Sequence, residues 1–116
     1  MKRSEMLKKN HLFTAAYRKG KSRAAANVVV YALRNYHRAA ATKIGIAASA
    51  KLGGAVKRNR VKRIIRAAAG SMYPRLDCGY FIIIAARKPC FDKQRKSTEI
   101  ERELSGLFAG LNLFKA

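Results

Sequence analysis

The segment from Lys57 to Arg66 most constrains the fold, because it combines six positive charges with apolar residues at helical spacing. At about 100° per residue, one side of a helix here is an apolar stripe made of Val61, Ile64, Ile65 and Ala68. The other side is polar, with Arg60 and Lys62 flanking Asn59, Arg63 and Arg66. The spacing predicts a helix over about residues 55–69, ended by Gly70, that buries the stripe and exposes the cations.

Positive charges greatly outnumber negative charges along the chain. The sequence has 26 Lys and Arg against 6 Asp and Glu, a formal net charge of +20 on 116 residues. No acidic residue occurs between Arg38 and Arg66, whereas solvated charged faces usually mix both signs. Without a polyanion, such a cluster destabilises the compact state through self-repulsion. We therefore expect contact with nucleic acid, mainly through phosphates and weakened by salt.

The remaining patterns predict a single α+β domain over residues 1–116, with residues 1–9 as a flexible basic arm. A short helix is expected from Asn10 to about Lys19, ended by Gly20. Strands are expected over residues 27–33 and 43–50, paired antiparallel because the link between them is short. The apolar run over residues 80–86 indicates a central strand covered on both faces.

The C-terminal part of the chain is expected to contain a basic loop over residues 87–95 and then a helix. Thr98 and Glu101 have the spacing of a capping box, and Glu99, Glu101 and Glu103 suit the positive end of a helix dipole. The following apolar residues predict a core-facing helix: Ile100, Leu104, Leu107, Phe108 and Leu111.

Residues for a conventional active site are sparse. His11 and His37 are isolated among basic residues, and no acidic pair is spaced for catalytic metals. Gly53-Gly54 lacks the rest of a phosphate-loop motif, so a strand-to-helix turn is expected there. Cys78 and Cys90 are too few for a disulfide framework and suit a reducing cytoplasm. No catalytic or metal-binding residue, no membrane span and a cytoplasmic location are expected.

Three aromatic residues allow two interpretations. Phe13 and Tyr17 are one helical turn apart, and Tyr31 lies on the first predicted strand. They can pack in the core, or they can line a groove in which unpaired bases stack.

From Lys51 to Arg66 the sequence KLGGAVKRNRVKRIIR closely resembles the bacterial ribonuclease P protein component. Further matches are the Leu7-Lys-Lys-Asn10 run, Phe13, Tyr17, Gly20, the strand around Tyr31, Ile44-Gly-Ile46 and the segment from Tyr80 to Pro89, so that the resemblance covers nearly the whole chain. Gly54 stands where the family usually has Asn, Ala50 where it commonly has Lys, and Ala67-Ala68-Ala69 where its helix end is bulkier.

The resemblance implies an α-β-β-β-α-β-α fold with the basic helix in a left-handed βαβ crossover. It also implies the small subunit of a ribonucleoprotein whose RNA removes the 5′ leader from precursor tRNA, with Mg²⁺ bound chiefly by the RNA and no obligate protein partner. By position, the residues meeting the catalytic RNA would be Lys57, Arg58, Asn59, Arg60, Lys62, Arg63 and Arg66. Those lining the leader cleft would be Phe13, Tyr17, Tyr31 and Lys51.

Two other functions fit the charge and size of the chain. A small basic ribosomal protein would have no leader groove and would copurify with a ribosomal subunit. A free-standing nuclease is disfavoured by the missing acid and histidine constellation.

Overall fold

The computed structural model describes residues 6–7, 10–35, 40–92 and 96–115. Along the chain the elements are α1 (Asn10–Lys19), β1 (Lys21–Ala24), β2 (Val28–Arg34), β3 (Lys43–Ala47), α2 (Ala55–Met72), a 3₁₀ turn (Tyr73–Arg75), β4 (Tyr80–Ala86), α3 (Lys88–Asp92) and α4 (Ser97–Gly110). Apart from the 3₁₀ turn and the short α3, this order is the expected α-β-β-β-α-β-α arrangement.

The four strands form one mixed sheet in the order β1-β2-β4-β3. β4 pairs antiparallel with β2 and parallel with β3. The expected antiparallel pairing of residues 43–50 with residues 27–33 is therefore wrong. The apolar β4 lies between those two strands and pairs with both, which leaves β3 at the edge of the sheet.

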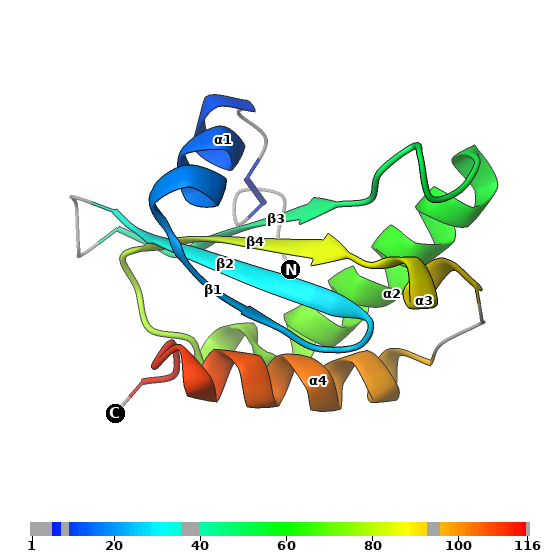
Figure 1. Cartoon of the computed structure of the whole chain (residues 1–116). Helices are drawn as coiled ribbons and strands as arrows, with labels where there is room; N and C mark the ends of the chain where they lie inside the picture. The colour runs from blue at the N-terminus through cyan, green and yellow to red at the C-terminus, as the bar shows by residue number, and fades with distance from the viewer. Residues whose placement is uncertain (1–5, 8–9, 36–39, 93–95, 116) are drawn as a thin grey trace.

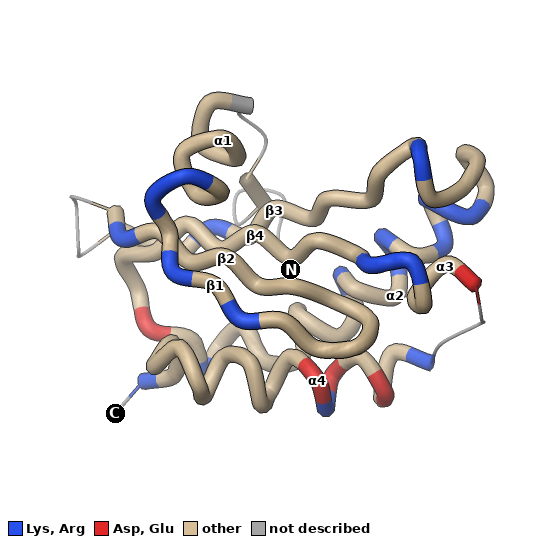
Figure 2. The backbone as a smooth tube through the Cα atoms, in the orientation of Figure 1, with Lys and Arg blue, Asp and Glu red and all other residues tan. Residues whose placement is uncertain are grey.

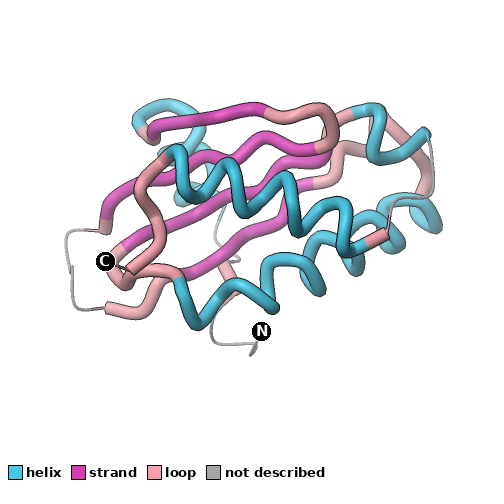
Figure 3. Tube along the Cα trace, turned by 90° about the horizontal axis from the view of Figure 1, so that it is seen from below, coloured by secondary structure: helices cyan, strands magenta, loops and turns pink. Residues whose placement is uncertain are grey.

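α2 connects the parallel strands β3 and β4 by a crossover on one face of the sheet. In Figure 3 the helices lie in front of the sheet, and when β3 and β4 are turned to point up, β4 lies to the left of β3. The crossover is left-handed, against the usual rule. It confirms what the family resemblance implied for this connection.

The helices cover both faces of the sheet. α2 and α4 lie side by side on one face, and α1 lies on the other (Figures 1 and 3). The larger core fills the α2–α4 side and includes the fully buried Ile65, Ile82 and Leu104. A smaller cluster under α1 contains the buried Leu7, Ala16 and Ile83. The prediction of a central strand with two covered faces is confirmed for β4.

β1 was expected only from the family resemblance, because its four residues, KSRA, are all exposed and show no alternation. A close approach at Gly20 fixes its start. A Cβ atom on Gly20 would lie 2.6 Å from the carbonyl oxygen of Ala16 and 2.8 Å from that of Ala32. The absence of a side chain at Gly20 thus lets the chain leave α1 and pair at once with β2.

Three expectations at element ends are wrong. α2 continues through Gly70 to Met72, because Ala69 and Met72 are fully buried and extend the core-facing stripe. Residues 88–92 of the expected loop form α3, whose Cys90 and Phe91 are buried. α4 begins at Ser97 with Lys96 as its N-cap and no side-chain capping bond, so Thr98 lies inside the helix rather than capping it.

Most of the expected N-terminal arm, residues 1–5 and 8–9, lies outside the described residues. Met6 and Leu7 do not fit a free arm. Met6 forms a parallel bridge with Ile44, and the Leu7 amide donates to the Ile44 carbonyl at 2.8 Å. Leu7 is buried under α1, so apolar burial holds this part of the chain against β3.

Candidate nucleic-acid interface

The basic ridge is the polar side of α2, made of Lys57, Arg58, Asn59, Arg60, Lys62, Arg63 and Arg66. Its exposed members are Lys57, Asn59, Arg63 and Arg66, and the other three are half-buried. On the opposite side Val61, Ile65 and Ala68 have no exposed surface. The predicted division of this helix into an apolar stripe and a cationic side is confirmed. One apolar face fixes the helix on the sheet and thereby fixes the direction of the ridge.

Two arginines of the ridge lie close to the protein surface instead of extending into solvent. Arg60 Nη2 donates to the carbonyl oxygen of Phe91 at 3.4 Å, which ties the ridge to α3. Among the described residues, the buried Nε atoms of Arg58 and Arg60 have no hydrogen-bond partner. A guanidinium has five N–H donors, so both side chains keep donors for an incoming phosphate or base edge.

Cations of other segments gather at the same end of the molecule. Figure 2 shows Lys and Arg concentrated where α2 begins, where β3 leads into α2 and where β4 ends. Lys51 lies exposed in the loop between β3 and α2, and Arg87 and Lys88 follow β4. Asp92 at the end of α3 adds one carboxylate near this region, and the other acids in view lie mainly on α4. The resulting surface is suited to a polyanion.

A second surface lies on the α1 side of the sheet, where Tyr17 of α1 meets Tyr31 of β2. Their ring centroids are 4.8 Å apart, with the ring planes at 84°. Tyr17 remains 44% exposed. Partial burial, and to a smaller extent its neighbour Tyr31, raise the pKa of the Tyr17 hydroxyl above 10.0. The pair presents partly exposed aromatic rings, on which a base can stack.

Phe13, on the same helix as Tyr17, packs against the sheet. Gly45 on β3 leaves space for its ring, because a Cβ atom there would lie 2.5 Å from Phe13 Cζ and 3.0 Å from Ile83 Cδ1. Phe13 belongs to the smaller apolar cluster together with the buried Ile83. Of the three aromatic residues, Phe13 and Tyr31 are half-buried and pack against this cluster, whereas Tyr17 is exposed.

Beyond the tyrosine pair, one row of small residues crosses the sheet. The strand register brings together Ala24, Val29, Ala85 and Ala47. The last three are half-buried although they lie in or beside central strands, so this part of the sheet is only partly covered. α1 and the loop from β3 to α2 rise on the same side of the sheet as this row (Figure 1). We call the surface formed by Tyr17, Tyr31 and this row the open groove. The loop that carries Lys51 borders it.

Sequence reasoning missed a buried polar contact between α4 and the turn that joins β1 to β2. Asn27, 5% exposed, donates its backbone N–H to Glu103 Oε1 at 2.9 Å and its side-chain amide to Glu103 Oε2. Glu103 thus joins α4 to the turn before β2 instead of serving the helix dipole. Glu103 lies three residues after Ile100 and four before Leu107, both of which are buried, and this spacing gave a weak signal of its role.

Within the described residues, no group of three His, Cys, Asp or Glu side chains is placed to hold a metal ion. His11 is exposed on α1, and His37 lies outside the described residues. The described helices include none that is long and apolar enough to cross a bilayer. The arrangement can bind phosphates and stack bases.

Comparison with known proteins finds relatives of this chain in sequence and in fold. A family profile described as Ribonuclease P matches residues 1–112. The ribonuclease P protein component of Bacillus cereus strain G9842 is 38% identical over 108 residues, which cover 93% of this chain and 91% of the relative. The structure of the Staphylococcus aureus RNase P protein matches with a TM-score of 0.80 and 32% identity, covering 96% of this chain and 98% of that one. The Thermotoga maritima RNase P protein, 23% identical, shares the fold with a TM-score of 0.76 over 88% of this chain and 93% of its own.

Proposed function

The chain belongs to the ribonuclease P protein family, and from this premise we propose that it is the RNA-binding subunit of a ribonucleoprotein that removes the 5′ leader from precursor tRNA. The observation that carries the proposal is the presence of two RNA-suited surfaces on one small chain. They are the basic ridge of α2 and the open groove between α1 and the sheet. One surface suits a structured RNA, and the other suits an unpaired strand.

The basic ridge is proposed to bind the catalytic RNA. Arg side chains donate bidentate hydrogen bonds to phosphates, and the half-buried Arg58 and Arg60 lose little freedom on binding because the protein already restrains them. Asn59 has an amide that can bond a base edge or a 2′-hydroxyl. Affinity at the ridge should fall steeply with salt, since phosphate contacts release counterions.

The open groove is proposed to bind the single-stranded leader. Tyr17 and Tyr31 offer ring surface for bases, Phe13 holds α1 at the right height above the sheet, and Lys51 adds a charge at the border. Mature tRNA has no leader and gains nothing from these contacts. The groove would therefore let the complex distinguish precursor from product.

The chemistry is proposed to belong to the RNA, with no catalytic residue in the protein. The described residues provide no carboxylate cluster that fits Mg²⁺, so the ion would be held chiefly by RNA phosphates. The protein would contribute its net charge of +20, which lowers the repulsion between the catalytic RNA and its substrate.

The proposal is tested by measuring precursor tRNA cleavage by the catalytic RNA at low Mg²⁺, with and without the protein. We expect strong stimulation by the wild type and weaker stimulation by Arg63→Gln/Arg66→Gln, which removes two exposed charges from the ridge without touching its buried stripe. Stimulation by neither protein would overturn the proposal. Cleavage by protein stripped of RNA would instead support the free-standing nuclease.

A further inference from the structure

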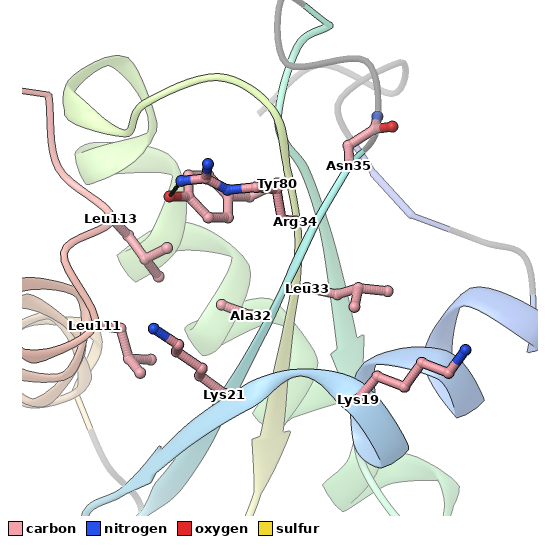
Figure 4. A pocket seen from close by; sticks show the side chains of 9 residues that line it. All are labelled: Lys19, Lys21, Ala32, Leu33, Arg34, Asn35, Tyr80, Leu111 and Leu113. Carbon is pink, nitrogen blue, oxygen red and sulfur yellow. Dashed lines mark hydrogen bonds between the residues drawn. The ribbon is translucent and has the colours of Figure 1, made fainter.

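A cavity of about 550 Å³ lies at the end of the sheet away from the start of α2. Its walls come from the end of α1, the start of β1, the end of β2, the start of β4 and the segment after α4. Figure 4 shows Lys21, Leu111, Leu113 and the Arg34–Tyr80 pair around one hollow, with Lys19 and Leu33 on the other side of β2. This size is within the range of small-ligand sites.

The cavity combines cations with an apolar wall. Lys19, Lys21 and Arg34 contribute three positive charges, and no carboxylate is among its described lining residues. Leu111, Leu113 and Ala32 supply the apolar surface. Backbone bonds hold the two leucines in place, since the Leu111 amide donates to Leu107 at 3.1 Å and the Leu113 amide to Phe108 at 3.0 Å. An apolar wall beside cations fits a nucleotide, which has a flat base and a phosphate.

Arg34 is positioned before any ligand arrives. Its guanidinium lies over the Tyr80 ring, 5.4 Å from the centroid, and Nη2 donates to the Tyr80 hydroxyl at 3.0 Å. That bond uses one of five N–H donors. β1 pairs with β2 only as far as Ala32, so Arg34 extends past the edge strand, where a phosphate can reach it.

The cavity continues from the open groove. Leu33 follows Tyr31 by two residues on the same face of β2 and lines the cavity on the α1 side. Ala32, Leu111 and Leu113 line it on the α4 side. Two residues of a strand span about 7 Å, which one nucleotide unit can bridge. α2, which carries the basic ridge, begins at the other end of the sheet from the cavity, and α1 lies over the sheet between the two (Figure 1). A strand that starts at the ridge and crosses the tyrosines would reach Leu33 next, and it would enter the hollow by passing the edge of β2 at Arg34, where β1 no longer pairs.

We propose that this cavity holds one unpaired leader nucleotide, farther from the cleavage site than the nucleotides on Tyr17 and Tyr31. Lys21 and Arg34 contact its phosphate, and its base packs on Ala32, Leu111 and Leu113. This inference rests on the proposed function of the groove. It predicts a contact that appears only when the leader is long enough to pass the tyrosine pair.

The test uses the holoenzyme reconstituted from catalytic RNA and protein, with precursor tRNAs whose leaders increase in length one nucleotide at a time. The dissociation constant is measured for wild type, Arg34→Gln, Lys21→Gln and a matched control, Arg75→Gln. Arg75 also lies over an aromatic ring, 5.0 Å from the centroid of Phe114, but it is outside the cavity. Arg34→Gln should match wild type for short leaders and bind about fivefold more weakly beyond a threshold length. Lys21→Gln should show the same threshold, and Arg75→Gln should show none.

An equal loss for Arg34→Gln at every leader length, or for mature tRNA, would overturn the proposal. A weakened affinity of the protein for the catalytic RNA alone would assign the cavity to that RNA and would equally overturn it. Tyr17→Ala is measured in parallel on short leaders. If it weakens precursor binding while Arg34→Gln shows no length threshold, the cavity proposal fails and the proposed function of the groove stands.

Discussion

Tyr17 and Tyr31 meet edge to face at 4.8 Å between centroids and so join α1 to β2 on the open side of the sheet. The contact fixes the two rings relative to each other but leaves Tyr17 44% exposed. The Tyr17 ring is available to a base because α1 covers only part of this face of the sheet.

Replacing either tyrosine with alanine should weaken precursor tRNA binding by the holoenzyme by about 1–3 kcal/mol, because each ring offers a stacking surface. Mature tRNA binding should not change. Tyr17→Phe keeps the ring and should bind precursor nearly as wild type. Equal losses for precursor and mature tRNA, measured as dissociation constants, would contradict the leader groove.

Phe13→Ala should act mainly on stability, lowering the free energy of unfolding by about 2 kcal/mol, since its ring packs in the cluster under α1. Gly45→Ala should destabilise by about 1–3 kcal/mol through a clash with that ring. The check is urea unfolding of the double variant Phe13→Leu/Gly45→Ala, compared with each of the two single variants. Phe13→Leu should recover part of the loss caused by Gly45→Ala, whereas simple additivity of the two changes would argue against the packing described.

The two adjacent glycines before α2 should respond in opposite directions. A side chain on Gly54 meets nothing within 4 Å, and Gly54 is the N-cap of α2 without a capping side chain, so Gly54→Asn should stabilise by about 0.5 kcal/mol. Gly53→Ala should destabilise by about 1 kcal/mol because its Cβ would lie 2.9 Å from the buried Phe91 ring. Thermal unfolding distinguishes the two, and a lower melting temperature for Gly54→Asn would refute the open space at that position.

Glu103→Ala should lower the free energy of unfolding by about 1–3 kcal/mol, because it leaves the backbone N–H and side-chain amide of the buried Asn27 without their acceptor. Glu101→Ala removes the same charge two residues earlier on α4 and serves as the control. Chemical denaturation should show a much smaller change for it. Similar losses for both variants would mean that helix charge, not the bond to Asn27, determines the effect.

Local sequence patterns were sufficient to predict the buried faces of α2, α4 and β4. The basic ridge of α2 follows from the spacing of Val61 and Ile65, and the core face of α4 from Ile100 and Leu104. The central position of β4 follows from its unbroken apolar run. In the two helices the burial of side chains repeats with the helical period, and in β4 both faces are apolar, so these patterns can be read without knowing the partner.

Other features depend on contacts between distant residues, and local patterns misplaced them. Gly70 was expected to end α2, yet burial of Met72 in the core carries the helix past it. Thr98 and Glu101 had capping-box spacing, yet α4 starts at Ser97 with Lys96 as its cap. At Gly70 a short local signal was outweighed by packing against other elements.

By itself, the sequence determined which side chains face a core and where the cationic side of α2 lies, because both follow from backbone periodicity. Tertiary structure decided which strands are neighbours, that Tyr17 touches Tyr31, that Glu103 accepts from Asn27 and that a cavity forms beside Arg34. These relationships join residues far apart in the chain. Their free energy depends on how whole faces fit together, and no local spacing encodes that fit.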